Sequence, residues 1–322
     1  MHNIERNYIM TEKEALILDM DPGIDDAVAL SIALTHSEFD LKLLTGVAGN
    51  VSVEKTTANL LKLEEFFGRT DIPVAMGAKA PLKREFKDAS YIHGESGMPG
   101  YDFPALTHQP IDKDAIEAMV EVLDNADQAM TIVATGAYTN IALLLQQHPE
   151  VKPKIKRLIL MGGSLSGGNV SSVAEFNVFT DPDAANIIFQ SGLDITMIGL
   201  DVTLKALLSN QSIKDIAKMG EVGAMISGVM TAYNDAEGDG KPMHDVNTIL
   251  YLLHPEFFTV EEHMIYVITE GPAVGGTISD FQDRWSNGQK NSHVAVDIDA
   301  KAFEDWFLTE IPKMNAAKAA QQ

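Results

Sequence analysis

Acidic side chains crowd one short stretch near the start of the chain. Asp19, Asp21, Asp25 and Asp26 place four carboxylates within eight residues, directly after the apolar run Ala15 to Leu18. Four anions at one point would repel one another or take up protons, unless a metal ion or strong hydrogen-bond donors hold them charged. Because this segment offers only oxygen ligands, the expected occupant is a hard divalent cation. Each Asp alone could cap a turn or start a helix, but the four together favour a metal site.

Other polar residues lie where predicted strands end. Asn50, Thr135 and Met161 each close or follow an apolar run. The carboxyl ends of parallel strands meet at one edge of a sheet, where α/β proteins bind ligands, so we expect these residues to converge with Asp21. There Asn50 can hydrogen-bond a hydroxyl group, and a main-chain carbonyl near Thr135 can ligate a hard ion. Taken singly, each is an ordinary loop residue.

Carboxylate and carboxamide side chains gather again between Gly168 and Asn177. Glu175 and Asn177 alternate around Phe176 and would point the same way from an extended chain, and Asn169 precedes them. Such side chains suit a polyhydroxylated ligand such as a sugar. The chain has no glycine-rich phosphate cradle with its lysine, which disfavours a phosphate ligand.

Two histidines have neighbours that suggest function. His93 lies in the segment Gly77 to Pro110, which is rich in Gly, Pro and His, resists regular structure and is a candidate lid. His244 and Asp245 precede an apolar helix. Asp245 is either the cap of that helix or a fifth carboxylate for the metal, and His244 is either a surface residue or a proton donor. Spacing alone favours the cap.

The elements that must position these residues follow an alternating pattern. Apolar strand-like runs alternate with amphipathic helix-like runs, which predicts an α/β fold with an open, mostly parallel twisted sheet flanked by helices. The predicted strands are Ala15 to Leu18, Leu41 to Val47, Ala129 to Ala134, Leu158 to Met161, Asp194 to Gly199, His263 to Thr269 and His293 to Ile298. The predicted helices are Asp25 to Leu34, Val53 to Phe67, Tyr138 to His148, Pro182 to Gln190, Gln211 to Met219, Val222 to Tyr233, Val246 to Leu253 and one from Ala300. No linker or internal repeat divides the chain, so we expect a flexible lead over 1–13 and a single domain over 14–322.

The composition excludes several functional classes. The chain has 322 residues and is 45% hydrophobic, which is enough for a full-sized core. Its 24 Lys and Arg against 46 Asp and Glu give a net charge of −22, which disfavours nucleic-acid and anionic membrane partners. The lack of cysteine excludes disulfides, thiolate metal sites and a cysteine nucleophile. No apolar run approaches the roughly 20 residues of a membrane span, and Met1 to Lys13 does not resemble a signal peptide, so we expect a cytoplasmic protein.

Taken together, these motifs resemble those of the inosine–uridine-preferring nucleoside hydrolase family. The signature Asp19-Met20-Asp21-Pro22-Gly23-Ile24-Asp25-Asp26-Ala27 is highly specific to that family, and the match runs from Ile17 to about Asp297. The later blocks, in the family's order, are Val47-Ala48-Gly49-Asn50, His93-Gly94-Glu95-Ser96-Gly97, Thr135-Gly136, Met161-Gly162-Gly163, Ala174-Glu175-Phe176-Asn177 and Pro242-Met243-His244-Asp245. The resemblance implies a Rossmann-like nucleoside hydrolase fold and calcium-dependent hydrolysis of the N-glycosidic bond of ribonucleosides. It also implies a homodimer or homotetramer.

The resemblance further implies roles for individual residues. The family's Ca²⁺ would be held by Asp21, Asp26, the main-chain carbonyl of Thr135 and Asp245, with Asp21 as the general base that deprotonates a calcium-bound water. The ribose hydroxyls would be bound by Asp25, Asn50, Asn169, Glu175 and Asn177, with Met161 lining the same pocket. Near the base, His244 would help the departing base to leave, His93 would lie on a mobile loop, and Tyr233 would contact the base.

The base preference and the reaction class each have alternatives. His244 resembles members acting on uridine, cytidine and inosine, and we expect a preference for pyrimidine ribonucleosides; the alternative is broad inosine–uridine specificity. A haloacid dehalogenase-like phosphatase using Mg²⁺ also begins with Asp-x-Asp, and there Asp19 would be the nucleophile. The Pro-Gly-Ile-Asp-Asp continuation argues against that class. A non-catalytic nucleoside-binding protein on the same scaffold is the third possibility.

Overall fold

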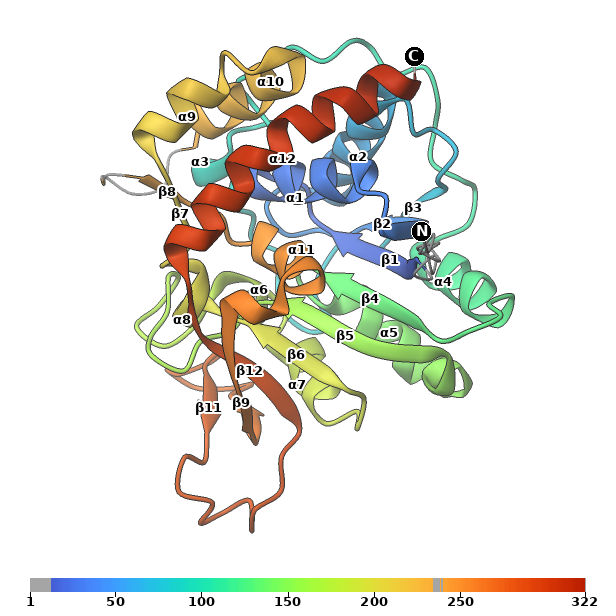
Figure 1. The fold of residues 1–322 in the computed structure, drawn as a ribbon. Helices are drawn as coiled ribbons and strands as arrows, with labels where there is room; N and C mark the ends of the chain where they lie inside the picture. The colour runs from blue at the N-terminus through green and yellow to red at the C-terminus, as the bar shows by residue number, and fades with distance from the viewer. Residues whose placement is uncertain (1–12, 234–237, 239, 322) are drawn as a thin grey trace, which may run out of the picture.

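A single eight-stranded sheet forms the centre of the molecule (Figure 1). The computed structural model describes residues 13–233, 238 and 240–321, so the expected flexible lead lies, apart from Lys13, outside the described residues. The strand order is β3-β2-β1-β4-β5-β6-β12-β9, and every neighbouring pair is parallel except β12 and β9. The predicted fold class, a single-domain, mostly parallel sheet flanked by helices, is confirmed.

The strands of the central sheet are short to medium in length. They are β1 (Glu14–Met20), β2 (Phe39–Gly46), β3 (Val74–Met76), β4 (Met130–Ala134), β5 (Ile155–Met161), β6 (Ile195–Ile198), β9 (Phe258–His263) and β12 (Ser292–Ile298). Two small antiparallel pairs lie outside the sheet: β7 (Leu207–Ser209) with β8 (Gly240–Pro242), and β10 (Ile265–Val267) with β11 (Thr277–Ser279).

Helices cover both faces of this sheet. The α-helices are α1 (Ile24–Thr35), α2 (Val53–Phe67), α3 (Ser90–His93), α4 (Ala115–Asp124), α5 (Thr139–Gln147), α6 (Phe176–Thr180), α7 (Pro182–Phe189), α8 (Leu200–Thr203), α9 (Asn210–Ile216), α10 (Gly220–Thr231), α11 (Val246–Leu253) and α12 (Ala300–Gln321). Short 3₁₀ helices span Pro149–Lys154 and Pro255–Phe257. Among the described helices, none is both long and apolar enough to cross a membrane.

The two hydrophobic cores follow from alternation along the buried strands. On β1, Leu16 and Leu18 pack in the core beneath α1, α2, α10, α11 and α12, whereas Ala15 and Ile17 pack in the core beneath α4, α5 and α7 (Figure 1). Successive side chains of a strand point to opposite faces, so a strand covered on both sides must be apolar throughout. This is why β1 reads as a continuous apolar run.

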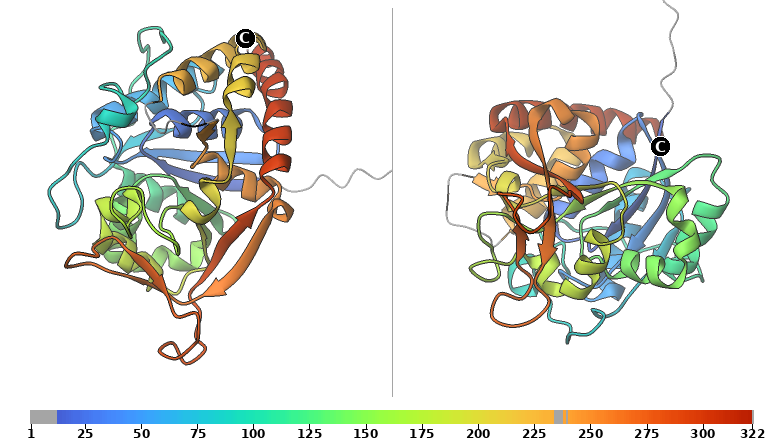
Figure 2. Two further views of the ribbon diagram at one scale, coloured as in Figure 1. Left: turned by 90° about the vertical axis from the view of Figure 1, so that its left-hand side faces the viewer. Right: turned by 90° about the horizontal axis from the view of Figure 1, so that it is seen from below.

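The predicted elements agree with the structure best where the pattern is long and periodic. Helices α2 and α11 have the predicted bounds, Val53–Phe67 and Val246–Leu253. The predicted strand over His263 to Thr269 is shorter in the structure, where Ile265–Val267 forms β10 and pairs with β11 outside the central sheet. His263 belongs instead to the end of β9, which pairs with β12. The loop between β11 and β12 projects from the body of the molecule (Figures 1 and 2).

Candidate active site

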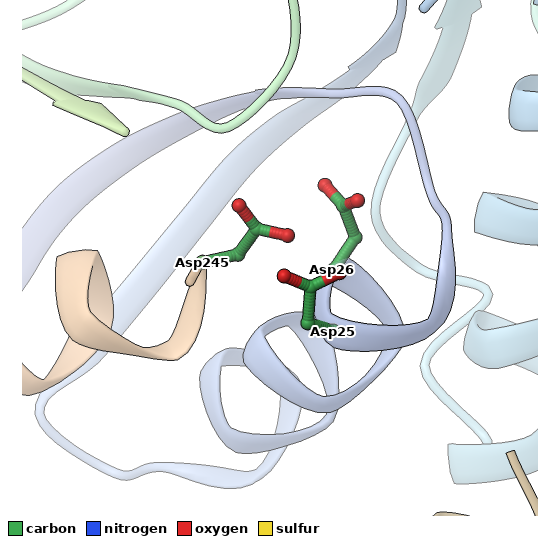
Figure 3. A group of neighbouring side chains, drawn as sticks. All are labelled: Asp25, Asp26 and Asp245. Atoms are coloured by element: carbon green, nitrogen blue, oxygen red, sulfur yellow. The ribbon is translucent and has the colours of Figure 1, made fainter. Parts of the chain in front are cut away.

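Three carboxylates meet between the start of α1 and the start of α11. Asp25 and Asp26 lie in the first turn of α1, and Asp245 directly precedes α11. Figure 3 shows the three side chains pointing toward one another. All three are buried, and one oxygen from each lies within 4.8 Å of the others. Burial, with repulsion from Asp26, raises the pKa of Asp25 to about 7, and burial likewise raises the pKa of Asp26 and Asp245.

Asp21 lies beside this cluster, in the turn between β1 and α1. Its Oδ2 accepts a hydrogen bond of 2.7 Å from the backbone N–H of Asn50. Its Oδ1 is buried and has no hydrogen-bond partner among the described residues. Burial first, and then the charges of Asp26 and Asp25, hold the pKa of Asp21 well above its usual range. An unsatisfied buried carboxylate oxygen is costly, and a cation beside it would remove that cost.

Glycines at two neighbouring loops allow Asp21 to sit this close to the backbone. A Cβ atom added at Gly49 would lie 1.9 Å from Asp21 Oδ2, and one at Gly136 would lie 2.9 Å from Oδ1. Neither distance is compatible with a side chain larger than hydrogen. Gly49 and Gly136 therefore leave the space that the Asp21 side chain occupies, and their neighbours Asn50 and Thr135 supply polar groups to the same site.

Asp26 joins the strand ends to the first helix. Its Oδ2 accepts from the backbone N–H of Gly23 and from Asn50 Nδ2, both at 3.1 Å, and its Oδ1 accepts from Thr135 Oγ1 at 2.7 Å. The bond to Gly23 is part of the capping of α1. Asp26 therefore has a structural role as a helix-start acid and also faces the acid cluster, so the two interpretations offered by the sequence are compatible.

Asp245 does not act as a helix cap through its side chain. It occupies the position before α11, but its carboxylate makes no capping hydrogen bond. Asp245 therefore holds the N-cap position that the spacing predicts, but its carboxylate turns toward Asp25 and Asp26 and does not cap the helix. The donor set of these carboxylates and nearby carbonyls contains only oxygen, which fits a hard divalent cation.

A cavity extends from the acid cluster toward the surface. Its lining brings together the expected residues Asp25, Asn50, His93, Thr135, Met161, Asn169, Glu175, Asn177, Tyr233, His244 and Asp245, along with Ala89, Tyr91, Ile92, Val170 and Phe176. Asp21 and Asp26 are not part of the lining and lie fully buried behind it. Residues of α3, within the segment 77–110, and of the Gly- and Ser-rich loop 164–172 thus reach the same cavity as those at the strand ends.

Glu175 and Asn177 reach the cavity through a helix and not through an extended chain. The predicted alternation is wrong, because Phe176–Thr180 forms α6 and Glu175 is its N-cap. The Glu175 carboxylate accepts from the backbone N–H groups of Gly163 and Asn177, both at 2.9 Å, and of Val178 at 3.1 Å. Burial nevertheless raises its pKa to about 7. The buried cap fixes the start of α6, and with it the side chain of Asn177.

Asn177 links the cavity wall to the strand ends. Its Nδ2 donates to the main-chain carbonyl of Thr135 at 2.7 Å and to that of Met161 at 3.2 Å. The Thr135 carbonyl, expected to ligate the cation, therefore already has one protein donor. A carbonyl oxygen has two lone pairs, so this bond leaves room for a second interaction.

The two histidines are buried, and each has its Nδ1 atom engaged. His93 Nδ1 accepts from the backbone N–H of Ile24 at 3.2 Å, and burial lowers its pKa to about 3. The His93 ring lies 5.5 Å from the Tyr233 ring, measured between centroids. His244 Nδ1 lies 2.8 Å from Thr203 Oγ1. His244 is only 7% exposed, so its alternative assignment as a surface residue is wrong.

Asp19 and Thr203 are two residues near the site for which the sequence signal was misleading or absent. Asp19 stood among the crowded carboxylates, but its Oδ1 accepts from Thr45 Oγ1 and Asn140 Nδ2, at 2.6 and 2.7 Å. These bonds engage Asp19 inside the sheet, which argues against the phosphatase in which Asp19 would be the nucleophile. Thr203, next to His244, also went unrecognised, because an isolated threonine has no motif that marks a contact 41 residues away.

Known proteins of one kind resemble this chain over almost its full length. The profile of the family described as inosine-uridine preferring nucleoside hydrolase matches residues 16–305. The non-specific ribonucleoside hydrolase RihC of Salmonella newport is 46% identical over 299 residues, which cover 92% of this chain and 97% of that protein. The structure of a purine-preferring ribonucleoside hydrolase from Gardnerella vaginalis has a TM-score of 0.88 at 32% identity and covers 95% of this chain and 100% of its own. A plant nucleoside hydrolase, PpNRh1, has a TM-score of 0.86 at 31% identity, with coverages of 93% and 99%.

Proposed function

Because this chain belongs to the inosine–uridine preferring nucleoside hydrolase family, we propose that it cleaves the N-glycosidic bond of ribonucleosides with water, releasing ribose and the free base. The supporting observation is the buried carboxylate cluster at one end of a cavity lined with amide side chains. Cleavage of this bond develops positive charge on the ribose ring, and an anionic pocket stabilises that charge. An enzyme of nucleoside catabolism therefore has a use for carboxylates that would otherwise only repel one another.

We propose Ca²⁺ as the metal of this site. Asp21, Asp26, Asp245 and the main-chain carbonyl of Thr135 would hold it, and the Asp25 carboxylate lies in the same cluster. Calcium accepts six to eight oxygen ligands in flexible geometry, which suits a site without nitrogen or sulfur donors. When bound, the cation supplies positive charge that keeps these carboxylates ionised and acidifies a neighbouring water.

The proposed roles of the protein groups follow from their chemistry. Asp21 takes the proton of the attacking water, because one of its oxygens has no other partner among the described residues and the other is fixed by Asn50. The ribose hydroxyls are bound by Asp25, Asn50, Asn169, Glu175 and Asn177, with Met161 alongside. The departing base carries negative charge unless it is protonated, so His244 serves as its donor, and His93 and Tyr233 lie on the same side of the cavity.

For the base, we propose a preference for the pyrimidine ribonucleosides uridine and cytidine. The alternative is a broad range that includes inosine. It is favoured by one observation, that the 46% identical relative is named a non-specific ribonucleoside hydrolase. Assembly as a homodimer or homotetramer and a cytoplasmic location stay predictions.

The test is release of reducing sugar from uridine, cytidine, inosine, adenosine and guanosine, each with calcium and with chelator. Calcium-dependent ribose release would support the hydrolase, and the relative rates would rank the bases. Phosphate release from a phosphomonoester, without ribose release, would point to the phosphatase. Calorimetric binding of uridine without cleavage would point to a binding protein.

A further inference from the structure

We propose that the active-site cavity continues into a second subsite, which takes an apolar group carried on the 5′ oxygen of the nucleoside. This subsite, the 5′ groove, has a volume of about 470 Å³ and is lined by Arg84, Glu85, Lys87, Asp88, Tyr91, Val170, Phe176, Phe179 and Thr180. The inference rests on the proposed function, since it extends the substrate of the same reaction. It predicts that the protein hydrolyses ribonucleosides that carry an aryl or alkyl ether at the 5′ position.

The 5′ groove and the cavity share a rim. Tyr91 of α3, Val170 of the loop 164–172 and Phe176 of α6 line both of them. Tyr91 is 69% exposed and Val170 is 37% exposed, so this rim is open to solvent and is not a closed wall. A group attached to a bound nucleoside can therefore cross the rim from the cavity into the 5′ groove.

One edge of the ribose faces the acid cluster. Asn50 Nδ2 donates to the Asp26 carboxylate at 3.1 Å, and Asn177 Nδ2 donates to the Thr135 carbonyl at 2.7 Å. These two residues and Asp25 are therefore the hydroxyl-binding groups next to the proposed cation. A hard cation prefers oxygen ligands, and the adjacent 2′ and 3′ hydroxyls are the pair that can reach it together.

The 5′ hydroxyl is left for Asn169 and Glu175, the other two residues proposed to bind the ribose. Each is followed in the sequence by a residue of the shared rim, Val170 after Asn169 and Phe176 after Glu175. The 5′ oxygen therefore lies beside the rim, whereas the base lies on the side of His93. A substituent on this oxygen is directed toward the 5′ groove.

The lining of the 5′ groove suits an apolar group better than a phosphate. Among the described residues that line it, the cations Arg84 and Lys87 are matched by the anions Glu85 and Asp88, so their formal charges cancel. The Arg84 guanidinium is already engaged, because it donates to the Phe179 carbonyl and lies 4.2 Å from the centre of the Phe179 ring. The other lining residues are mainly aromatic or aliphatic. Since an apolar cavity of about 150 Å³ is enough to bind benzene, the groove has room for a benzyl group.

The reaction itself is unchanged by the substituent. Water replaces the base at the anomeric carbon, the C1′–N bond breaks, the base leaves with a proton, and a 5-O-substituted ribose is released as the reducing sugar. An ether keeps the 5′ oxygen as a hydrogen-bond acceptor but loses its hydrogen. The reference substrate is therefore 5′-O-methyluridine, which has lost the same hydrogen and has no group large enough to fill the groove.

The test compares 5′-O-benzyluridine, 5′-O-methyluridine and uridine 5′-monophosphate on the unsubstituted protein with calcium, measured by release of the reducing sugar. We expect KM to be about 10-fold lower for the benzyl ether than for the methyl ether, with kcat within about 3-fold, because the phenyl ring leaves water. The monophosphate should have no advantage over the methyl ether. A benzyl ether that is no better than the methyl ether, or a monophosphate that is better than both, would overturn the proposal.

Phe179 is the residue to change, because it lines the 5′ groove and does not belong to the lining of the cavity. Phe179→Ala should raise KM for the benzyl ether about 5- to 10-fold and leave KM for uridine within about 2-fold, and Phe179→Leu should recover part of the loss. The matched control is Phe281→Ala, which truncates an aromatic side chain that is 66% exposed on the loop after β11 and should change neither value. Equal rises for uridine and for the benzyl ether in Phe179→Ala would contradict the proposed subsite.

This inference and the proposed function fail in different ways. If the unsubstituted protein released no ribose from any nucleoside, the proposed function would fail, and the 5′ groove would lose its substrate with it. If uridine were hydrolysed but the benzyl ether gave no lower KM than the methyl ether, only the 5′ groove would be refuted.

Discussion

At the scale of single residues, Asp21 combines a fixed position with an unsatisfied oxygen. We expect Asp21→Asn to lower kcat by at least about 100-fold, because a general base contributes roughly that much or more. The fold should persist, since the Asn carbonyl oxygen can still accept from the Asn50 N–H. In chelator, the variant should unfold at a temperature no lower than the unsubstituted protein, because it removes one of several mutually repelling buried charges. Ribose release and thermal unfolding measure both effects, and turnover above a tenth of the original rate would contradict the base role.

The amide and carboxylate groups around the ribose give a second residue-scale prediction. We expect 2′-deoxyuridine to be cleaved at least about 100-fold less efficiently than uridine, in terms of kcat/KM. The reason is that a site built to bind a hydroxyl leaves buried polar groups unpaired when the hydroxyl is missing. Initial rates on the two nucleosides at equal enzyme concentration provide the measurement. Comparable kcat/KM values would remove the ribose role from Asp25, Asn50 and Asn177.

The sequence was a good guide to residues at strand ends and a poor guide to residues facing inward. Asn50, Thr135 and Asp21 were expected to converge, and in the structure they surround one acid site. Asp19 and Asp21 are two residues apart, so an extended chain would point their side chains the same way. Asp19 nevertheless bonds to Thr45 and Asn140 inside the fold. Asn140 is 121 residues away, and a single sequence has no pattern that links the two.

At the scale of elements, α2 and the segment that packs over it contain a buried acid outside the active site. Glu64 is fully buried, and its Oε2 lies 3.1 Å from His108 Nε2, while the other ring nitrogen lies 2.6 Å from Glu65. Burial raises the pKa of Glu64 from its ordinary 4.5 to about 8. Burial opposes protonation of His108, but its hydrogen bonds to Glu65 and Glu64 prevail and raise its pKa.

These shifts predict that stability declines as the pH rises. The folded state holds a proton on Glu64 that the unfolded state loses above pH 4.5, so the stabilisation is complete below that pH and is lost by about pH 8. The raised pKa of His108 acts in the same direction. With saturating calcium, the melting temperature of the unsubstituted protein should fall between pH 6 and 8.5, and Glu64→Gln should show a smaller fall. Parallel curves for the two proteins would refute this assignment.

Element prediction failed where local patterns were short. Helix α6 has five residues, too few for a helical period, and its start is set by the buried cap Glu175. Strand β9 is an antiparallel edge whose position depends on β12, about 30 residues later. Long periodic segments such as α2 were predicted with their observed bounds. The difference reflects how much of each element is decided by its own residues and how much by distant partners.

At the scale of the whole molecule, the acid site joins distant parts of the chain. Asp26 and Asp245 come from α1 and from the residue before α11, and these two helices pack against each other. A cation bound there should stabilise the folded protein, because it has no comparable site in the unfolded chain. We expect calcium at about 100 times its dissociation constant to raise the melting temperature by roughly 5 °C. The gain should disappear with chelator and in Asp245→Asn, and a calcium response that survives Asp245→Asn would place the ion elsewhere.

The overall architecture was predictable because alternation of strand and helix is repeated along most of the chain. What could not be predicted was the order of the last strands: β12 lies between β6 and β9, although β9 precedes it in the sequence. That order depends on which edge of the sheet is open when the chain returns, and neither β9 nor β12 encodes it alone.

The positions of the site's acids along the chain also bear on how the protein is made. A ribosome releases the amino-terminal end first, so Asp21, Asp25 and Asp26 emerge long before His244 and Asp245. Until α11 has been synthesised, the nascent chain carries the first acids of the site without the carboxylate that completes their group. Growing or prematurely terminated chains are therefore expected to be inert toward cellular nucleosides, and hydrolysis begins only when nearly the whole protein has been translated.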